Sequence, residues 1–121
     1  MKIIKKMIKS NSLIALLSLI SVNLLWKYNL ILFIVLMFLA FLLFLKRYSI
    51  QELKFFIYFG LAGGVAEIVA VYFNVWHYQN PNFFGVPIWL FVLWGIAGIY
   101  LGREYEKLAI KLQSTTNKKD K

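Results

Sequence analysis

Residues 29–45 read NLILFIVLMFLAFLLFL, an apolar run without a single charge that stops at Lys46 and Arg47. A helix needs roughly 20 apolar residues to cross the hydrocarbon core of a bilayer, with about 17 at the short end. The run therefore predicts a transmembrane helix, and it favours lipid over water as the main solvent of the fold.

Three more apolar segments accompany this run, at about residues 8–26, 53–75 and 86–102. With 29–45 they predict four transmembrane helices joined by short connections. We therefore expect an all-α fold, a polytopic membrane protein of two antiparallel helical hairpins. The whole forms a single four-helix membrane domain over residues 1–112.

The first apolar segment has a second interpretation. Lysines followed by an apolar core are also typical of a secretory signal peptide, which ends in small residues at its cleavage site. Ser21-Val22-Asn23 does not fit that pattern, and the next apolar run begins only a few residues later. We therefore expect residues 8–26 to be retained as the first span.

The composition agrees with a membrane protein. Of the 121 residues, 61% are hydrophobic and 16% are charged, whereas about a quarter of a soluble domain is charged. The net charge of +9 is compatible with nucleic-acid binding, but the basic residues flank apolar runs as membrane anchors do. We predict the lipid bilayer as a partner and no nucleic acid. The absence of cysteine excludes disulfides, thiolate metal ligands and cysteine nucleophiles.

The basic residues lie on one side of the predicted topology. Lys27 alone among the 14 lysines and arginines falls on the other side. The positive-inside rule then places both termini in the cytoplasm, in a multi-pass protein of the plasma membrane. Beyond the fourth span, apolar residues at helical spacing predict a cytosolic amphipathic extension; they are Leu101, Tyr105, Leu108 and Leu112. Residues 113–121 are polar, and we expect them to be disordered.

Glu67 is the only charged side chain near the middle of a predicted span. A charge at that depth costs about 2.5–3.5 kcal/mol on insertion scales, and such residues often have a function. Two interpretations stay open: a functional carboxyl, or a strut that hydrogen-bonds between helices. The candidate catalytic residues are Glu67, His77 and Tyr78, and the candidate binding residues are Glu67, Trp94, Ser18 and Trp76.

Small residues predict close packing of the third and fourth spans, because they let two helix backbones approach each other. The residues concerned are Gly60, Gly63, Gly64, Gly95, Gly98 and Gly102. Such packing would bring Trp94 to the depth of Glu67, where its indole N–H can donate to the carboxyl. Ser18 reaches a similar depth in the first span, although a serine in a helix commonly bonds to its own backbone.

His77 is the sole histidine of the chain. It follows Glu67 by ten residues, or about 15 Å if the helix persists that far, which is too long for a direct pair. It is either inert at the membrane interface or a proton donor and acceptor near neutral pH. One histidine and one glutamate cannot supply the three or four ligands of a metal site, so we predict neither a metal nor another cofactor.

Several of these residues form a longer pattern: Ala66-Glu67, then 73–78 (FNVWHY), then Gly85-Val86-Pro87, then Trp94. The pattern resembles membrane carotenoid-biosynthesis proteins of the carotenoid hydratase type, which carry an intramembrane Glu, an F-G-x-Y-x-Y run, G-V-P and a Trp. In this chain Asn stands in place of the expected Gly, and Trp in place of the first Tyr. The resemblance implies an isoprenoid-handling membrane fold with Glu67 and Tyr78 in the polyene site.

Three functions remain open. The first is a non-enzymatic subunit that packs its helices against a second copy or another membrane protein. The second is a proton-coupled transporter of small molecules that uses Glu67; small multidrug exporters have this size, but their Glu lies in the first helix. The third is an enzyme acting on an isoprenoid, with Glu67 as general acid. Catalysis usually needs more than one ionisable residue, and Glu67 is the only one within the predicted spans at mid-depth, so the first function is favoured.

Overall fold

The computed structural model describes residues 11–119, and within them the chain forms four α-helices. They are α2 (Asn11–Leu25), α3 (Asn29–Lys46), α4 (Ile50–Tyr72) and α5 (Trp89–Lys119). The described part contains no strand, and Phe83 and Val86 pair only as an isolated bridge. The prediction of an all-α fold of four helices is confirmed.

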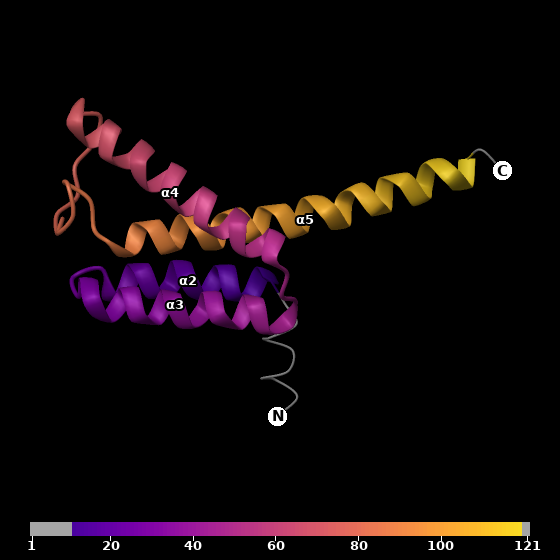
Figure 1. Cartoon of the computed structure of the whole chain (residues 1–121), viewed down its shortest axis with the longest axis horizontal. Helices are drawn as coiled ribbons and strands as arrows, with labels where there is room; N and C mark the ends of the chain where they lie inside the picture. Colours follow the sequence, from indigo (N-terminus) through magenta and orange to yellow (C-terminus); the bar gives the residue numbers. More distant parts are fainter. Residues whose placement is uncertain (1–10, 120–121) are drawn as a thin grey trace.

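Helix α5 is the central element (Figure 1). It approaches each of the other three helices closely, whereas α4 approaches only α5 and reaches α3 through the edge-to-face rings of Phe44 and Phe56. Helices α2 and α3 lie side by side and form the first hairpin, and α4 and α5 form the second. Figure 1 shows that α4 diverges from α5 toward the 73–88 loop.

Local signals explain the two ends of α4. The Ser49 hydroxyl accepts the backbone N–H of Glu52 at 3.1 Å, so Ser49 is the N-cap. At the other end Asn74 has a positive φ of 60°. The backbone N–H groups of Asn74 and Val75 donate to the carbonyls of residues 71 and 70, which is the Schellman pattern of a helix C-terminus. Helix α4 therefore ends at Tyr72, before the predicted limit of 75, and the loop turns back toward it.

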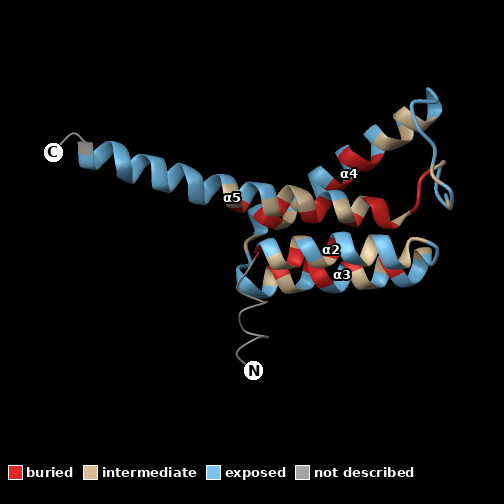
Figure 2. Cartoon of the chain, turned by 180° about the vertical axis from the view of Figure 1, so that it is seen from behind, coloured by how far each residue is buried: buried red, intermediate tan, exposed pale blue. Residues whose placement is uncertain are grey.

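The end of α5 corrects one prediction. The helix continues to Lys119, so a disordered tail from Gln113 is wrong for residues 113–119; the last two residues, and residues 8–10 of the first predicted span, lie outside the described part. Thr115 and Thr116 donate to the carbonyls four residues earlier, so their hydroxyls do not interrupt the helix. The apolar residues of the extension are exposed over this length (Figure 2).

The buried core lies where α5 meets α2 and α3. Its residues come from the inner face of α5, from α3 and from α2, and include Val92, Ile96, Ile99, Leu32, Leu36, Leu43 and Ile14. Most large apolar side chains on the outer faces are exposed. Helices α3 and α4 are both long and apolar enough to cross a membrane, and α2 is a shorter apolar helix.

The α4–α5 contact is built on glycine. A Cβ atom at Gly60 would lie 2.8 Å from the carbonyl oxygen of Phe91, closer than real Cβ atoms approach such a neighbour. Similar clashes would arise between four further glycines and aromatic rings: Gly63 with Trp94, Gly64 with Phe91, Gly95 with Phe56 and Gly98 with Phe59. Gly102 differs, because a Cβ there would meet nothing within 4 Å. This glycine borders open space and does not bring the helices together.

Candidate functional site

The first polar cluster surrounds Glu67, near the end of α4. Its Oε2 atom accepts two hydrogen bonds, from Trp76 Nε1 at 2.9 Å and from the Tyr78 hydroxyl at 2.7 Å. Both donors belong to the loop that follows the helix, which returns over α4 because Asn74 adopts a left-handed conformation. We call Glu67, Trp76 and Tyr78 the Glu67 cluster.

Tyr78 is held as a hydrogen-bond donor. Burial, and then the hydrogen bond and negative charge of Glu67, raise the pKa of Tyr78 well above its usual range. A raised pKa favours the neutral phenol, so the hydroxyl keeps its proton at every physiological pH. The Glu67 cluster is therefore a carboxyl group held by two neutral donors.

The structure does not gather the other candidate residues at Glu67. The Trp94 side chain packs where it faces Gly63, and the donors to Glu67 are Trp76 and Tyr78 instead. Ser18 donates to the Ile14 carbonyl at 2.9 Å, so it bonds to its own backbone. It also lies on α2, which does not approach α4.

His77 points away from the core and is exposed. It lines an open cavity of about 350 Å³ together with the end of α2, Tyr78 and Trp89. Within residues 11–119, His77 has no hydrogen bond or ion pair, and no group of three or more His, Asp or Glu side chains is placed to hold a metal ion.

Asparagines fasten the 73–88 loop to the first hairpin. Asn29 donates to the carbonyl of Asn80 at 3.0 Å and accepts from Trp89 Nε1 at 3.0 Å. Asn80 in turn donates to the carbonyl of Lys27 at 2.9 Å. These bonds join the loop, the turn between α2 and α3, and the start of α5. No sequence spacing predicts such contacts, because the paired residues lie more than 50 positions apart.

The second polar cluster lies at the opposite end of the bundle, around Arg103 of α5. Its side chain is 4% exposed. Nε donates to Glu52 Oε2 at 2.8 Å and Nη2 donates to Glu52 Oε1 at 3.1 Å, a two-point contact. Nη1 donates to Asn11 at 3.0 Å, and Nη2 also reaches the carbonyls of Leu43 and Arg47, each at 3.0 Å.

The Arg103 cluster thus joins all four helices at one point. Its outer member is Arg47, which donates to Glu52 at 3.2 Å and to Glu106 at 3.0 Å. The hydrogen bond to Glu106 and, to a smaller extent, the hydrogen bond to Glu52 raise the pKa of Arg47. Arg47 and Glu106 are each 51% exposed, so this outer pair faces solvent while the Arg103–Glu52 pair does not.

Sequence reasoning treated Arg103 only as a basic residue beyond the fourth span. Two signals pointed to its role. Arg103 continues the stripe of Val92, Ile96 and Ile99 at helical spacing, and those residues are buried. In addition, Ser49 and Glu52 have the S-x-x-E spacing that marks the start of a helix, which places the carboxylate in the first turn of α4.

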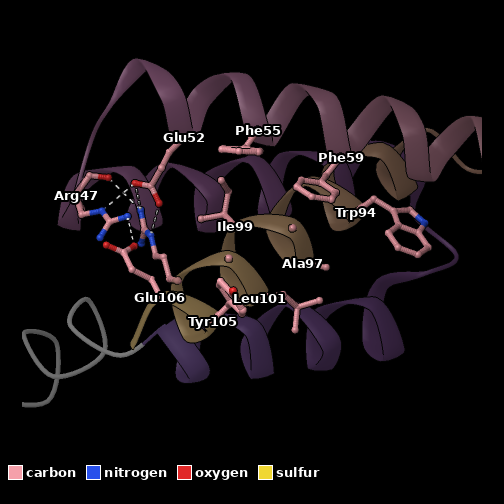
Figure 3. Close-up of a pocket in the computed structure, with 13 residues that line it drawn as sticks. Arg47, Glu52, Phe55, Phe59, Trp94, Ala97, Ile99, Leu101, Tyr105 and Glu106 are labelled. Carbon is pink, nitrogen blue, oxygen red and sulfur yellow. Dashed lines mark hydrogen bonds and ion pairs between the residues drawn. The ribbon is translucent and has the colours of Figure 1, made fainter. Parts of the chain in front are cut away.

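A groove runs between α4 and α5 from Trp94 to the Arg103 cluster (Figure 3). Its volume is about 510 Å³. The walls are mainly apolar and include Phe55, Phe59, Ala97, Ile99 and Leu101, and the charged end is formed by Arg47, Glu52, Arg103 and Glu106. Gly102 lies in the wall, and the open space beside it is part of this groove.

These features define an all-α protein with two apolar helices of membrane length, a buried arginine–glutamate cluster at one end and an aromatic-held carboxyl at the other. The chain belongs to the family described as "Protein of unknown function (DUF817)", whose model matches residues 3–119. No curated protein and no solved structure matches the chain. The roles of the side chains are therefore inferred from their own contacts.

Arg103→Gln should destabilise the fold far more than Arg47→Gln. Removing one partner of a buried pair leaves an uncompensated charge and typically costs about 3–5 kcal/mol, whereas an exposed pair contributes about 0–1 kcal/mol. Thermal unfolding of the purified protein in detergent measures both. The double variant Glu52→Gln/Arg103→Gln should recover part of the loss, because no unpaired charge remains. Equal effects of Arg47→Gln and Arg103→Gln would contradict this role.

Proposed function

We propose that the protein is an integral membrane protein with four spans and both termini in the cytoplasm. The exposed apolar outer faces and the membrane length of α3 and α4 support this placement. The distribution of charge supports the orientation, since within residues 11–119 every Lys and Arg except Lys27 lies at or beyond the Arg103 end of the bundle, and the 73–88 loop carries none. The Arg103 cluster then lies at the cytoplasmic interface and the Glu67 cluster toward the outer one.

Single cysteines test this topology, because the chain contains none. Gln79→Cys lies in the 73–88 loop and Gln113→Cys lies near the end of α5; both positions are exposed. A membrane-impermeant maleimide should label the first in intact cells and the second only after permeabilisation. Phe38→Cys, exposed in the middle of α3, should resist labelling in both cases because it faces lipid. Labelling of positions 79 and 113 from the same side would rule out the topology.

We further propose that the protein acts as a helix-packing subunit, and that two copies associate through α4. The observation that carries this proposal is the uncovered state of α4, since α5 is the only helix of the described part that approaches it closely. On an outer side of α4, Ala62 and Ala66 are exposed and Ala70 is half-buried. Small residues four apart let two membrane helices approach closely.

The Glu67 cluster suits a structural role in such a subunit. One carboxylate oxygen takes both donors, and both come from the loop that leaves the same helix. The cluster therefore fixes the loop against α4, and the asparagine contacts fix the other side of the loop to α2 and α3. This arrangement holds the outer end of α4 in place although α4 diverges from α5 there.

Ala66→Leu should weaken association, because a larger side chain prevents close approach of the two helices. Overpacking typically costs about 1–3 kcal/mol, so the dissociation constant should rise by roughly fivefold or more. Energy transfer between labelled copies in lipid vesicles measures it. Val65→Leu is the matched control, since Val65 is exposed on another side of α4. A protein that is monomeric in vesicles, or equal effects of the two variants, would contradict association through Ala66.

One observation favours a second candidate function, an enzyme acting on an isoprenoid. The resemblance to carotenoid hydratases implies that Glu67 and Tyr78 share a site, and their side chains are 2.7 Å apart. In that role a protonated Glu67, held in place by Tyr78 and Trp76, would transfer its proton to an alkene carbon; water would add to the resulting cation, and the proton that the added water loses would return to Glu67. Its Oε1 atom has no hydrogen bond to another residue within 11–119.

Glu67→Gln separates the two candidates. The amide oxygen of glutamine still accepts hydrogen bonds, so the loop and the association of copies should remain as in the wild type. Under the subunit proposal, membranes containing either protein leave an added acyclic carotenoid unchanged. Conversion by the wild type that disappears in Glu67→Gln would favour the enzyme, and loss of association in Glu67→Gln would show that the charge itself is needed for assembly.

A further inference from the structure

The α4–α5 groove has the shape of a site for one lipid chain. It follows α5 from Trp94 to Tyr105, which is about 16 Å at the rise of an α-helix. Half of the roughly 30 Å hydrocarbon core is about the same length. Trp94 lies midway along the predicted fourth span, and Arg103 lies just beyond its cytoplasmic limit. The groove therefore corresponds to the depth of the cytoplasmic leaflet.

The two helices leave this space open because of which residues line it. Phe55 and Phe59 of α4 stand on one wall and Ala97, Gly98 and Gly102 of α5 on the other. Gly98 receives the Phe59 ring, whereas nothing approaches within 4 Å of a Cβ built on Gly102. The part of the groove beside Gly102 is therefore not filled by side chains of the described residues.

The positive charge at the polar end of the groove comes from two lysines beside it. The four charged residues that line the groove itself, Arg47, Glu52, Arg103 and Glu106, balance one another. Arg103 and Glu52 neutralise each other in the buried pair. A second cavity of about 190 Å³ shares Arg47, Arg103 and Glu106 with the groove and adds Lys46 and Lys107. The mouth therefore attracts an anion.

Arg47 is the group best placed to receive that anion. It is half exposed, and its Nε and Nη2 atoms make the bonds to Glu52 and Glu106, while Nη1 has no hydrogen bond to a residue of the described part. Nη1 can therefore donate a charge-assisted hydrogen bond to a phosphate oxygen while Nε and Nη2 keep their carboxylate partners. Arg103 is unsuited, because all three of its nitrogens are engaged within the protein.

We propose that this groove binds an anionic phospholipid of the cytoplasmic leaflet, with one acyl chain between α4 and α5 and the phosphate at Arg47. Basic pockets between membrane helices on the cytoplasmic side are known to suit such headgroups. The proposal rests on the membrane placement proposed above, and it is independent of the association of two copies. The Arg103 cluster forms the charged end of the groove, next to the proposed headgroup site.

Native mass spectrometry of the full chain in detergent tests the proposal, with dioleoyl phosphatidylglycerol and dioleoyl phosphatidylcholine added in equal amounts. The wild type should retain phosphatidylglycerol preferentially. Arg47→Gln should reduce that preference by about fivefold, the effect of one basic residue near an anionic headgroup. Lys118→Gln removes the same charge near the far end of α5 and should leave the preference unchanged.

Gly102→Leu tests the chain site separately. The added side chain enters open space, so the fold should persist while the groove is filled and retention of both lipids falls. Ala109→Leu, exposed on α5 beyond the groove, is its control. Equal retention of the two lipids by the wild type would overturn the proposal. Unchanged lipid retention in Gly102→Leu would also overturn the proposal. If that variant left lipid retention unchanged but altered the association of copies, a second copy of the protein would be the occupant of the groove.

Tryptophan fluorescence quenching in the wild type tests the chain site even if Gly102→Leu fails to fold. Phosphatidylglycerol with brominated acyl chains quenches tryptophan on contact, and Trp94 is exposed to the groove. The share of quenched fluorescence should fall in Trp94→Phe and should be smaller with brominated phosphatidylcholine. Quenching that is equal for the two lipids would overturn the proposed selectivity, whatever the topology experiment shows.

Discussion

The contact between Arg103 and Glu52 sets the conditions for the rest of the structure. A guanidinium that is almost fully buried must satisfy its donors inside the protein, because an isolated buried charge is very costly. Each nitrogen of Arg103 has a partner, and these partners come from α2, from the end of α3 and from the first turn of α4. One side chain of α5 therefore fixes the position of every other helix at this end. The ion pair contributes more to the arrangement of the helices than to the stability of the fold, because a protein in which apolar residues of similar size replace a buried ion pair is often equally stable.

The two ends of the bundle are held by different means. At the Arg103 end the helices meet around ionic bonds that point inward. At the other end α4 diverges from α5 (Figure 1), and the space between them is bridged by the 73–88 loop. Neutral donors, Trp76 and Tyr78, attach this loop to Glu67, and Asn80 attaches it to the first hairpin. Glycines keep the crossing point close, so α4 is defined by one tight crossing and a fastening at each end.

Much of the fold was predictable because apolar runs, charges and glycines act locally. The 29–45 run becomes α3 almost unchanged, and a hydrogen bond joins Glu67 and Tyr78, whose roles stay predictions. The donors to Glu67 were only partly predictable, since they depend on the left-handed Asn74 that turns the loop back. The role of Arg103 could not be predicted, because it is the first charge after the fourth apolar run and hydropathy ends the span there. A side chain on the buried face of a helix can remain inside the protein beyond that limit when its partners are supplied by other helices, and hydropathy carries no information about them.

The groove and the exposed alanines of α4, Ala62 and Ala66, lie on the same side of this helix at different depths in the membrane. Phe59, Ala62 and Ala66 are three and four residues apart, so they follow one another along one face of the helix. In the cytoplasmic half, phenylalanines and the open space at Gly102 keep a second helix at a distance, and a flexible acyl chain fits such a gap better than a rigid helix does. In the outer half, alanines permit close contact between backbones. A lipid below and a second copy above are therefore compatible occupants of this side of α4, because each meets the residues whose size suits it.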